Sequence, residues 1–382
     1  MSQLFNHARL ILADRVIECG ALETVNGVIT AIHEQPLPEG CGMDLGGDDL
    51  IPGLVEIHTD NLEKHLMPRN GVLWPMLPAV ITHDAQCVAA GITTVLDALS
   101  VGDLEGESVR LETLHTAFAA INAGQEAGVF RADHLIHLRC ELAYPDLLAE
   151  LAPLIDHPAV RLVSVMDHTP GQRQYRDLAQ YKKYYAKKKV NWTDDTFEAA
   201  VAERRAMQAR YSATHNAAVV EMAQARRIAL ASHDDATHDH VRESHQLGSV
   251  IAEFPTTFEA AEASRRHGMN VLMGAPNIVR GGSHSGNVAA SQLASLGLLD
   301  ILSSDYYPAS LLDAAFRVAD DESNRFTLPQ AIRLVTKNPA SALNLQDRGE
   351  IAEGKRADLV LAHRKGEHVH IDHVWRQGKR VF

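Results

Sequence analysis

Histidine and carboxylate residues follow several short apolar runs of this chain, and these are the residue types that bind divalent metal ions. The run GLVEIHTD ends in His58 and Asp60, which on a regular strand would project to the same side. Imidazole and carboxylate groups are ligands for zinc and similar ions, and an open coordination position can hold an activated water. Any one such residue could instead cap a helix or face solvent, so the prediction of a metal site rests on the whole set. Its members are His58, Asp60, Glu141, His168, His233 and Asp305.

The elements that must position these residues are short apolar segments that alternate with helical patterns. Near-continuous apolar strands in such an alternation are typical of a parallel sheet, and eight of them favour a closed (β/α)8 barrel of the TIM type. An open doubly wound sheet is the alternative, but no GxGxxG motif follows the first strand. Barrel enzymes carry their chemistry at the C-terminal strand ends, where the candidate ligands would converge. The candidate strands are 53–57, 92–98, 134–140, 161–166, 228–232, 249–253, 270–274 and 299–304.

Neighbouring polar residues compete for some of these roles. In the stretch SHDDATHDH, His233 is closest to the strand end, and His238 either reaches the site or lies on the surface. Asp97 and Asp167 also end strands, and we expect them to support ligands rather than to bind metal. Asp305 ends the last strand and is the best candidate for a general base, because its carboxylate could bind metal and proton alternately.

A basic, aromatic segment stands out in an acidic protein. Residues 172–190 contain seven Lys or Arg and one Asp, a net charge of +6, whereas the whole chain has a formal charge of −13. The segment belongs to an insertion near 172–215 that follows the fourth candidate strand, where an active-site lid would attach. It is either a cationic arm over phosphate groups or a solvated surface that docks a partner.

A glycine-rich run, NIVRGGSHSGN at 277–287, favours the phosphate interpretation, because its backbone and side chains could form an anion cradle. Basic residues on the loop after the first strand could add charge. The candidate substrate-binding residues are Lys64, Arg69, Arg173, Arg280, Ser283 and His284.

Composition and the chain ends limit the class of protein. The excess of 49 Asp and Glu over 36 Lys and Arg argues against nucleic acid or an anionic membrane as the main partner. No run approaches the roughly 20 apolar residues of a membrane-spanning helix, and no secretory signal is evident. The four cysteines follow no CxxC pattern, so we expect a cytoplasmic protein.

The β-rich ends, 1–52 and 346–382, predict a small β-sandwich domain beside a barrel domain of residues 53–345.

Several motifs resemble known families. LIPGLVEIHTD, AIRLVTKNPASALNLQDRGEIAEGKRADLVL and the late-strand Asp305 resemble the amidohydrolase superfamily, metal-dependent hydrolases with a (β/α)8 barrel and a β-sandwich built from both chain ends. More narrowly, HTDNLEKHLMPR, MDHTPGQRQY, ASHDDATHDHV and LSSDYYPASLL resemble the PhnM family of the carbon–phosphorus lyase pathway, over essentially the whole chain. That resemblance implies removal of pyrophosphate from α-D-ribose 1-methylphosphonate 5-triphosphate, leaving the 5-phosphate.

The resemblance also implies cofactors and partners. One or two divalent ions are expected, with zinc as the first choice and manganese or iron as alternatives. The expected partner is a small phosphorylated sugar, without nucleic acid or membrane. A homo-oligomer, or transient contact with pathway enzymes, is left open.

The chain departs from the superfamily pattern at several positions. His58-Thr59-Asp60 stands where HxH is usual. No lysine ends the third or fourth strand to form a carboxylated bridge, and Glu141 would take its place. The sixth strand ends in Glu253, where a histidine ligand is common, so either the strand count slips by one or Glu253 takes part. The number of metal ions is therefore open.

Two other functions are compatible with the same fold. A conventional amidohydrolase acting on a cyclic amide or an N-acyl amino acid would share the barrel and the metal but would need no polyphosphate cradle. A non-enzymatic scaffold would have lost its ligands, and the retained His58, His168, His233 and Asp305 argue against it.

Overall fold

The structure, a computed structural model, describes residues 2–104, 109–175, 178, 181–182, 193–283, 286–366 and 368–382. The chain divides into two compact units. Unit 1 comprises Met1–Asp97, Ala119–Leu135 and Leu272–Phe382, and unit 2 comprises Ala98–Phe118 and Ile136–Val271. Among the described residues, none of the helices has both the length and the hydropathy that crossing a bilayer requires.

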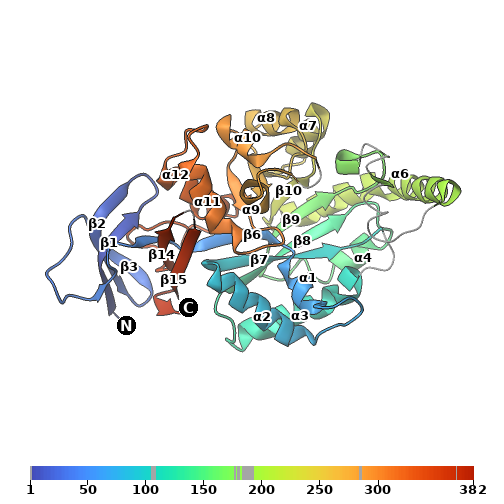
Figure 1. Ribbon diagram of the computed structural model, residues 1–382. Coiled ribbons are helices and arrows are strands. Elements are labelled where there is room, and N and C mark those ends of the chain that lie inside the picture. Colours follow the sequence, from blue (N-terminus) through green and yellow to red (C-terminus); the bar gives the residue numbers. More distant parts are fainter. Residues whose placement is uncertain are drawn as a thin grey trace. The chain divides into compact units, whose positions relative to one another are not determined.

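Both chain ends build one mixed sheet in unit 1 (Figure 1). Its strand order is β16-β15-β14-β5-β1-β2-β3, with β4 beside β1, and the pairing is antiparallel except where β1 meets β4 and β5. One face packs around Phe5, Leu22 and Trp375, which fits the alternation of apolar and polar residues along the strands. The strands are β1 (Ser2–Ile11), β2 (Val16–Val25), β3 (Val28–His33), β4 (Met43–Asp44), β5 (Asp49–Pro52), β14 (Leu359–Lys365), β15 (His368–Arg376) and β16 (Lys379–Arg380).

A second sheet of eight strands follows the chain in order, β13-β12-β11-β10-β9-β8-β7-β6. Each of the eight strands predicted from the sequence is present, so the strand count does not slip. Within unit 1, β6 lies beside β13 through a parallel bridge between Thr59 and Asp305, which closes the sheet into the predicted (β/α)8 barrel. The strands are β6 (Leu54–Thr59), β7 (Ile92–Val101), β8 (Asp133–Glu141), β9 (Val160–Met166), β10 (Ala229–His233), β11 (Ile251–Glu253), β12 (Asn270–Gly274) and β13 (Ile301–Ser303).

Burial explains why the barrel strands read as apolar runs. All residues of β6 and all residues of β7 are buried, as expected for parallel strands whose two faces are both covered. A polar side chain on such a strand needs a partner inside the protein. The polar residues of these strands are therefore informative about the site.

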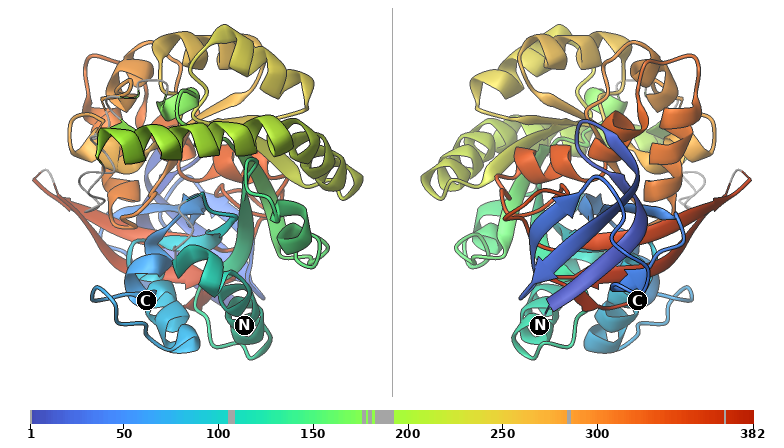
Figure 2. Two further views of the ribbon diagram at one scale, coloured as in Figure 1. Left: turned by 90° about the vertical axis from the view of Figure 1, so that its right-hand side faces the viewer. Right: turned by 90° about the vertical axis from the view of Figure 1, so that its left-hand side faces the viewer.

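The helices follow the strands, and threonine caps start several of them. The hydroxyl groups of Thr193, Thr237 and Thr257 each accept a backbone N–H from the first turn of the next helix. Figure 2 shows α6 as one long helix of unit 2. The helices are α1 (Asn61–Leu66), α2 (Met76–Ala89), α3 (Val109–Glu126), α4 (Leu147–Leu151), η1 (Arg173–Tyr175), α6 (Asp194–Ala225), α7 (His238–Gln246), α8 (Phe258–Arg266), α9 (Ala275–Val279), α10 (Ala290–Ser295), α11 (Ser310–Asp320), α12 (Leu328–Arg333) and α13 (Lys337–Ala342).

Candidate metal sites

The first group of candidate ligands lies where β6 meets β13 in unit 1. His58 is buried near the end of β6, Asp60 follows that strand, and Asp305 follows β13. One ligand atom from each residue lies within 4.8 Å of the others. The spacing of two residues places His58 beside Asp60, and closure of the barrel brings in Asp305.

Backbone hydrogen bonds hold Asp305 in an unusual conformation. Its φ is 54°, in the left-handed region that costs a residue other than glycine about 1–3 kcal/mol. The Asp305 N–H donates to the His58 carbonyl at 3.2 Å, and the Asp305 carbonyl accepts from the Asp60 N–H and the Thr59 hydroxyl, both at 2.8 Å. These three hydrogen bonds thus fix the strained backbone of Asp305, and such strained residues are common at functional sites.

Glu56 is a buried carboxylate in the same strand that sequence reasoning did not single out. Its two oxygens accept the backbone N–H of His58 at 2.7 Å and that of Ser304 at 2.5 Å. Burial raises the pKa of Glu56 to about 7, although the hydrogen bonds from Ser304 and His58 oppose the rise. The available signal was a glutamate inside an apolar run, two residues before His58.

The second group belongs to unit 2 and contains His168, His233 and Asp234. The Asp234 carboxylate oxygen Oδ2 lies 3.5 Å from His233 Nε2 and 3.9 Å from His168 Nε2. Asp234 directly follows β10 and has a φ of 56°, so its backbone is also left-handed. The sequence left several residues of SHDDATHDH as candidate metal ligands. The distances favour Asp234 as the residue that lies beside His233.

Two glutamates face the other ring nitrogens of these histidines. His168 Nδ1 lies 2.6 Å from Glu141 Oε2, and His233 Nδ1 lies 2.8 Å from Glu253 Oε2. Burial lowers the pKa of His168, but the Glu141 carboxylate outweighs that effect and the net shift is upward. When carboxylates hold Nδ1 in this way, each Nε2 is left to bind a metal.

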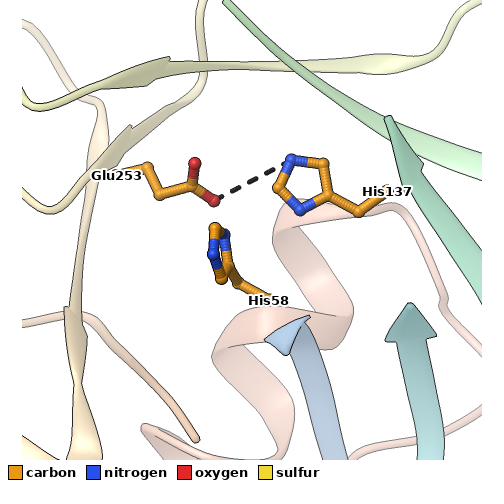
Figure 3. Close-up of side chains that lie close together, drawn as sticks. All are labelled: His58, His137 and Glu253. Atoms are coloured by element: carbon orange, nitrogen blue, oxygen red, sulfur yellow. Dashed lines mark ion pairs between the residues drawn. The ribbon is translucent and has the colours of Figure 1, made fainter. Parts of the chain in front are cut away.

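The strand-six glutamate has a further neighbour that sequence reasoning missed. Figure 3 shows the His137 ring turned toward the Glu253 carboxylate, with Nε2 and Oε1 4.0 Å apart; it also labels His58 of unit 1. The same His137 nitrogen lies 2.9 Å from the Ser164 hydroxyl. Glu253 therefore links histidines from β8 and β10 within unit 2, and its participation in metal binding stays a prediction.

Two of the predicted substrate-binding cations, Lys64 and Arg280, contact Tyr306, the residue after Asp305. The Lys64 ammonium donates to the Tyr306 carbonyl and lies 5.1 Å from the ring centroid. Arg280 Nη1 is 3.4 Å from the Tyr306 hydroxyl. Both cations are exposed, so they remain accessible to an anionic ligand.

The other predicted cations have different surroundings. Arg173 donates to the His233 carbonyl at 3.0 Å and pairs with the buried Asp235, so its guanidinium supports the end of β10. Arg69 lies in an exposed turn with Val72.

The remaining predicted residues lie in loops or at a helix start. His238 begins α7, is exposed, and lies 3.8 Å from Glu259. The Ser283 hydroxyl accepts the Asn287 N–H at 3.2 Å. His284 lies outside the described residues.

Part of the basic segment packs into a small apolar cluster. Tyr175 and Tyr181 contact Phe197 and Val201 of α6, and Tyr181 is fully buried. Lys182 pairs with Asp194 at the start of the same helix. The described tyrosines therefore serve packing, while most of residues 172–190, including most of the lysines, lie outside the described residues.

A buried network in unit 1 surrounds Asp97, the carboxylate expected to support the ligands. Its oxygens lie 2.8 Å from His83 Nε2 and 2.7 Å from His134 Nδ1, and the three side chains are at most 1% exposed. Burial opposes the charged forms, but the pairing outweighs it: the pKa of Asp97 falls well below its usual range and that of His134 rises to about 9.

Replacing Asp97 by Asn is expected to lower the free energy of unfolding by about 3 kcal/mol at pH 6, because it removes one of the two carboxylates that stabilise the buried His134 cation and leaves only Asp84, 3.3 Å from Nε2. His134 has a raised pKa, so its contribution is complete below about pH 6.5 and is lost as the pH rises through 9. Urea unfolding between pH 6 and 9 measures both effects. Asp347→Asn, which alters a half-exposed ion pair, is the control and should stay within about 1 kcal/mol of wild type. Equal stability of the Asp97 variant and wild type at pH 6 would contradict this account.

Comparisons with known proteins give the family of this chain and support its fold. The amidohydrolase family model matches residues 157–382. The chain is 62% identical to the alpha-D-ribose 1-methylphosphonate 5-triphosphate diphosphatase of Escherichia coli (strain K12), over 99% of this chain and 100% of that protein.

Solved structures with lower identity share the fold. An N-acetyl-D-glucosamine-6-phosphate deacetylase from Mycobacterium smegmatis has a TM-score of 0.62 at 18% identity, with 100% of both chains covered. A 5-methylcytosine deaminase from Klebsiella pneumoniae has a TM-score of 0.61 at 17% identity, covering 100% of this chain and 97% of its own. Together with the match over more than half of the chain and the whole-length relative, these findings establish that the chain belongs to the amidohydrolase family.

Proposed function

We propose that this chain is a metal-dependent hydrolase that removes pyrophosphate from α-D-ribose 1-methylphosphonate 5-triphosphate and leaves the 5-phosphate. The observation that carries the proposal is the 62% identity to a diphosphatase of that name over the whole length of both chains. The candidate metal sites and the cations beside Asp305 supply chemistry that such a reaction needs.

The donor atoms of the first group fit a divalent ion. His58 offers an imidazole nitrogen, and Asp60 and Asp305 offer carboxylate oxygens, all within 4.8 Å of one another. This is a donor set that zinc, manganese and iron accept, and zinc remains our first choice.

The donor atoms of the second group fit as well. His168, His233 and Asp234 offer two imidazole nitrogens and a carboxylate oxygen within the same limit. Glu141 and Glu253 would orient the two histidines through Nδ1, which refines the sequence-based prediction that Glu141 itself is a ligand. The convergence of all six predicted ligands on one centre stays a prediction.

The mechanism follows from the positions of the side chains. A divalent ion, when bound, lowers the pKa of a water and neutralises phosphate oxygens. Asp305 is suited to accept the proton of the attacking water, because its backbone is fixed by bonds to His58, Thr59 and Asp60. Lys64 and Arg280 are suited to bind oxygens of the triphosphate, whose terminal two phosphates leave as pyrophosphate.

Replacing Lys64 or Arg280 by Met is expected to raise KM for the triphosphate about tenfold each, because a hydrogen bond to a charged group contributes about 1.5–3 kcal/mol. Methionine keeps an apolar stem of similar length, so the fold should persist. Steady-state kinetics provide the measurement. The control is Lys379→Met on the exposed strand β16, which should leave KM unchanged. Wild-type KM in both variants would remove these cations from the substrate site.

The proposed reaction is tested by phosphorus NMR of the purified protein with added metal ions. The expected result is loss of the triphosphate signals and appearance of pyrophosphate together with a sugar 5-phosphate. A panel of cyclic amides and N-acyl amino acids is run in parallel. Turnover of an amide without turnover of the triphosphate would favour a conventional amidohydrolase, and no turnover of either would favour a scaffold.

We also infer that the protein works in the cytoplasm. Its cysteines, Cys19, Cys41, Cys87 and Cys140, are all free, which suits a reducing compartment. The metabolic activity of the curated relative is consistent with this location.

A further inference from the structure

Glu56 reaches both strands that carry the first group of candidate ligands. Its side chain is fully buried within β6. One oxygen accepts the N–H of His58 at 2.7 Å, and the other accepts the N–H of Ser304 at 2.5 Å. Ser304 directly precedes Asp305. The Glu56 carboxylate therefore binds the backbone of the candidate ligand His58 and the backbone next to the candidate ligand Asp305.

A carboxylate is a costly residue at such a position. Moving a charge into a dry interior is unfavourable, and well-packed apolar residues often stabilise a core more than buried charges do. Both donors to Glu56 named above are backbone N–H groups. Glu56 therefore restrains the main chain directly, with no partner side chain that could rotate away. The site gains from this, because metal ligands must be held close to the productive geometry.

The surrounding contacts explain why the N–H groups of His58 and Ser304 matter. An isolated parallel bridge pairs Thr59, the last residue of β6, with Asp305, which follows β13. The Asp305 N–H and carbonyl both bond to β6, and its φ of 54° is strained. Two hydrogen bonds to one Glu56 side chain therefore restrain the backbone just below the bridge, where small shifts would move His58 and Asp305 apart.

We propose that Glu56 is a positioning residue of the metal site formed by His58, Asp60 and Asp305. It acts on the ligands through the backbone and does not contact the substrate. The inference rests on the proposed function, because it requires that this group bind a divalent ion.

The test compares zinc affinity with stability in Glu56→Gln. The variant keeps the shape of the side chain, but its amide nitrogen faces a backbone N–H, so one of the two hydrogen bonds is lost. The expected result is an affinity for zinc, added alone to metal-free protein, that is about 10- to 100-fold weaker. The rate of triphosphate hydrolysis should recover toward wild type when zinc is raised to saturation.

Two further variants make the result decisive. Glu56→Asp keeps the charge but is one methylene shorter, so it cannot reach both N–H groups and should also weaken zinc binding. Asp358→Asn is the control: Asp358 is a buried carboxylate of unit 1, just before β14, that accepts the Gln377 N–H at 2.7 Å and pairs with Arg356 at 3.0 Å. It should lower the unfolding temperature without changing zinc affinity.

The outcomes separate this inference from the proposed function. Wild-type zinc affinity in either folded Glu56 variant overturns the positioning role, even if that variant is less stable. Equal weakening in Asp358→Asn also overturns it, because the effect would then be a general loss of stability. A wild-type chain that binds no ion and leaves the triphosphate intact overturns the proposed function itself.

Discussion

Replacing Asp305 by Asn is expected to lower the turnover of the triphosphate by about 100- to 10,000-fold, the usual contribution of a positioned general base. Asparagine has nearly the same shape but cannot accept a proton at neutral pH. It is also among the few residues that tolerate a left-handed backbone, so the φ of 54° at this position can be kept. Phosphorus NMR or a pyrophosphate assay gives the rate, and circular dichroism verifies the fold.

The Asp305 prediction needs a carboxylate control outside the site. Asp239→Asn alters an exposed residue of α7 that pairs with Arg242, and it should leave the rate unchanged. If the Asp305 variant hydrolysed the triphosphate at the wild-type rate, Asp305 would not be the base. If it lost activity only by losing its metal, zinc affinity would fall in parallel with the rate and saturating zinc would restore it.

Removing divalent ions with a chelator is expected to reduce hydrolysis to background, because neither activation of water nor neutralisation of the phosphates would then be supplied. Adding zinc, manganese or iron one at a time should restore the rate to different extents and so identify the metal. Elemental analysis gives the number of ions per chain. Chelator premixed with excess zinc is the control and should not inhibit.

Ligand variants extend the metal experiment to each group separately. His58→Ala removes a donor of the first group, and His233→Ala removes a donor of the second. Each should lower the amount of bound metal and the rate. His238→Ala, at the exposed start of α7, should change neither. Full activity of the wild-type chain with no detectable ion would exclude a metal-dependent mechanism.

The sequence by itself determined the barrel and the residues at its strand ends. Patterns of apolar residues are local, and a strand buried on both faces shows itself within a few residues, as 92–98 did. The sequence also paired His58 with Asp60, and their ligand atoms lie within 4.8 Å of each other although Asp60 follows the last residue of β6. All eight strands, and the mixed sheet built by the two chain ends, were therefore predictable. The domain boundaries at 52 and 346 stay a prediction.

Only the tertiary structure decided which polar residues share hydrogen bonds. Asp234 rather than His238 lies beside His233, Arg173 supports the end of β10, and Glu56 binds N–H groups of two strands far apart in the chain. The partner of a buried polar group depends on the register between strands and on the closure of the barrel, and neither leaves a periodic trace in the sequence. Periodicity gives the face on which a residue lies, whereas the distance to its partner follows from packing.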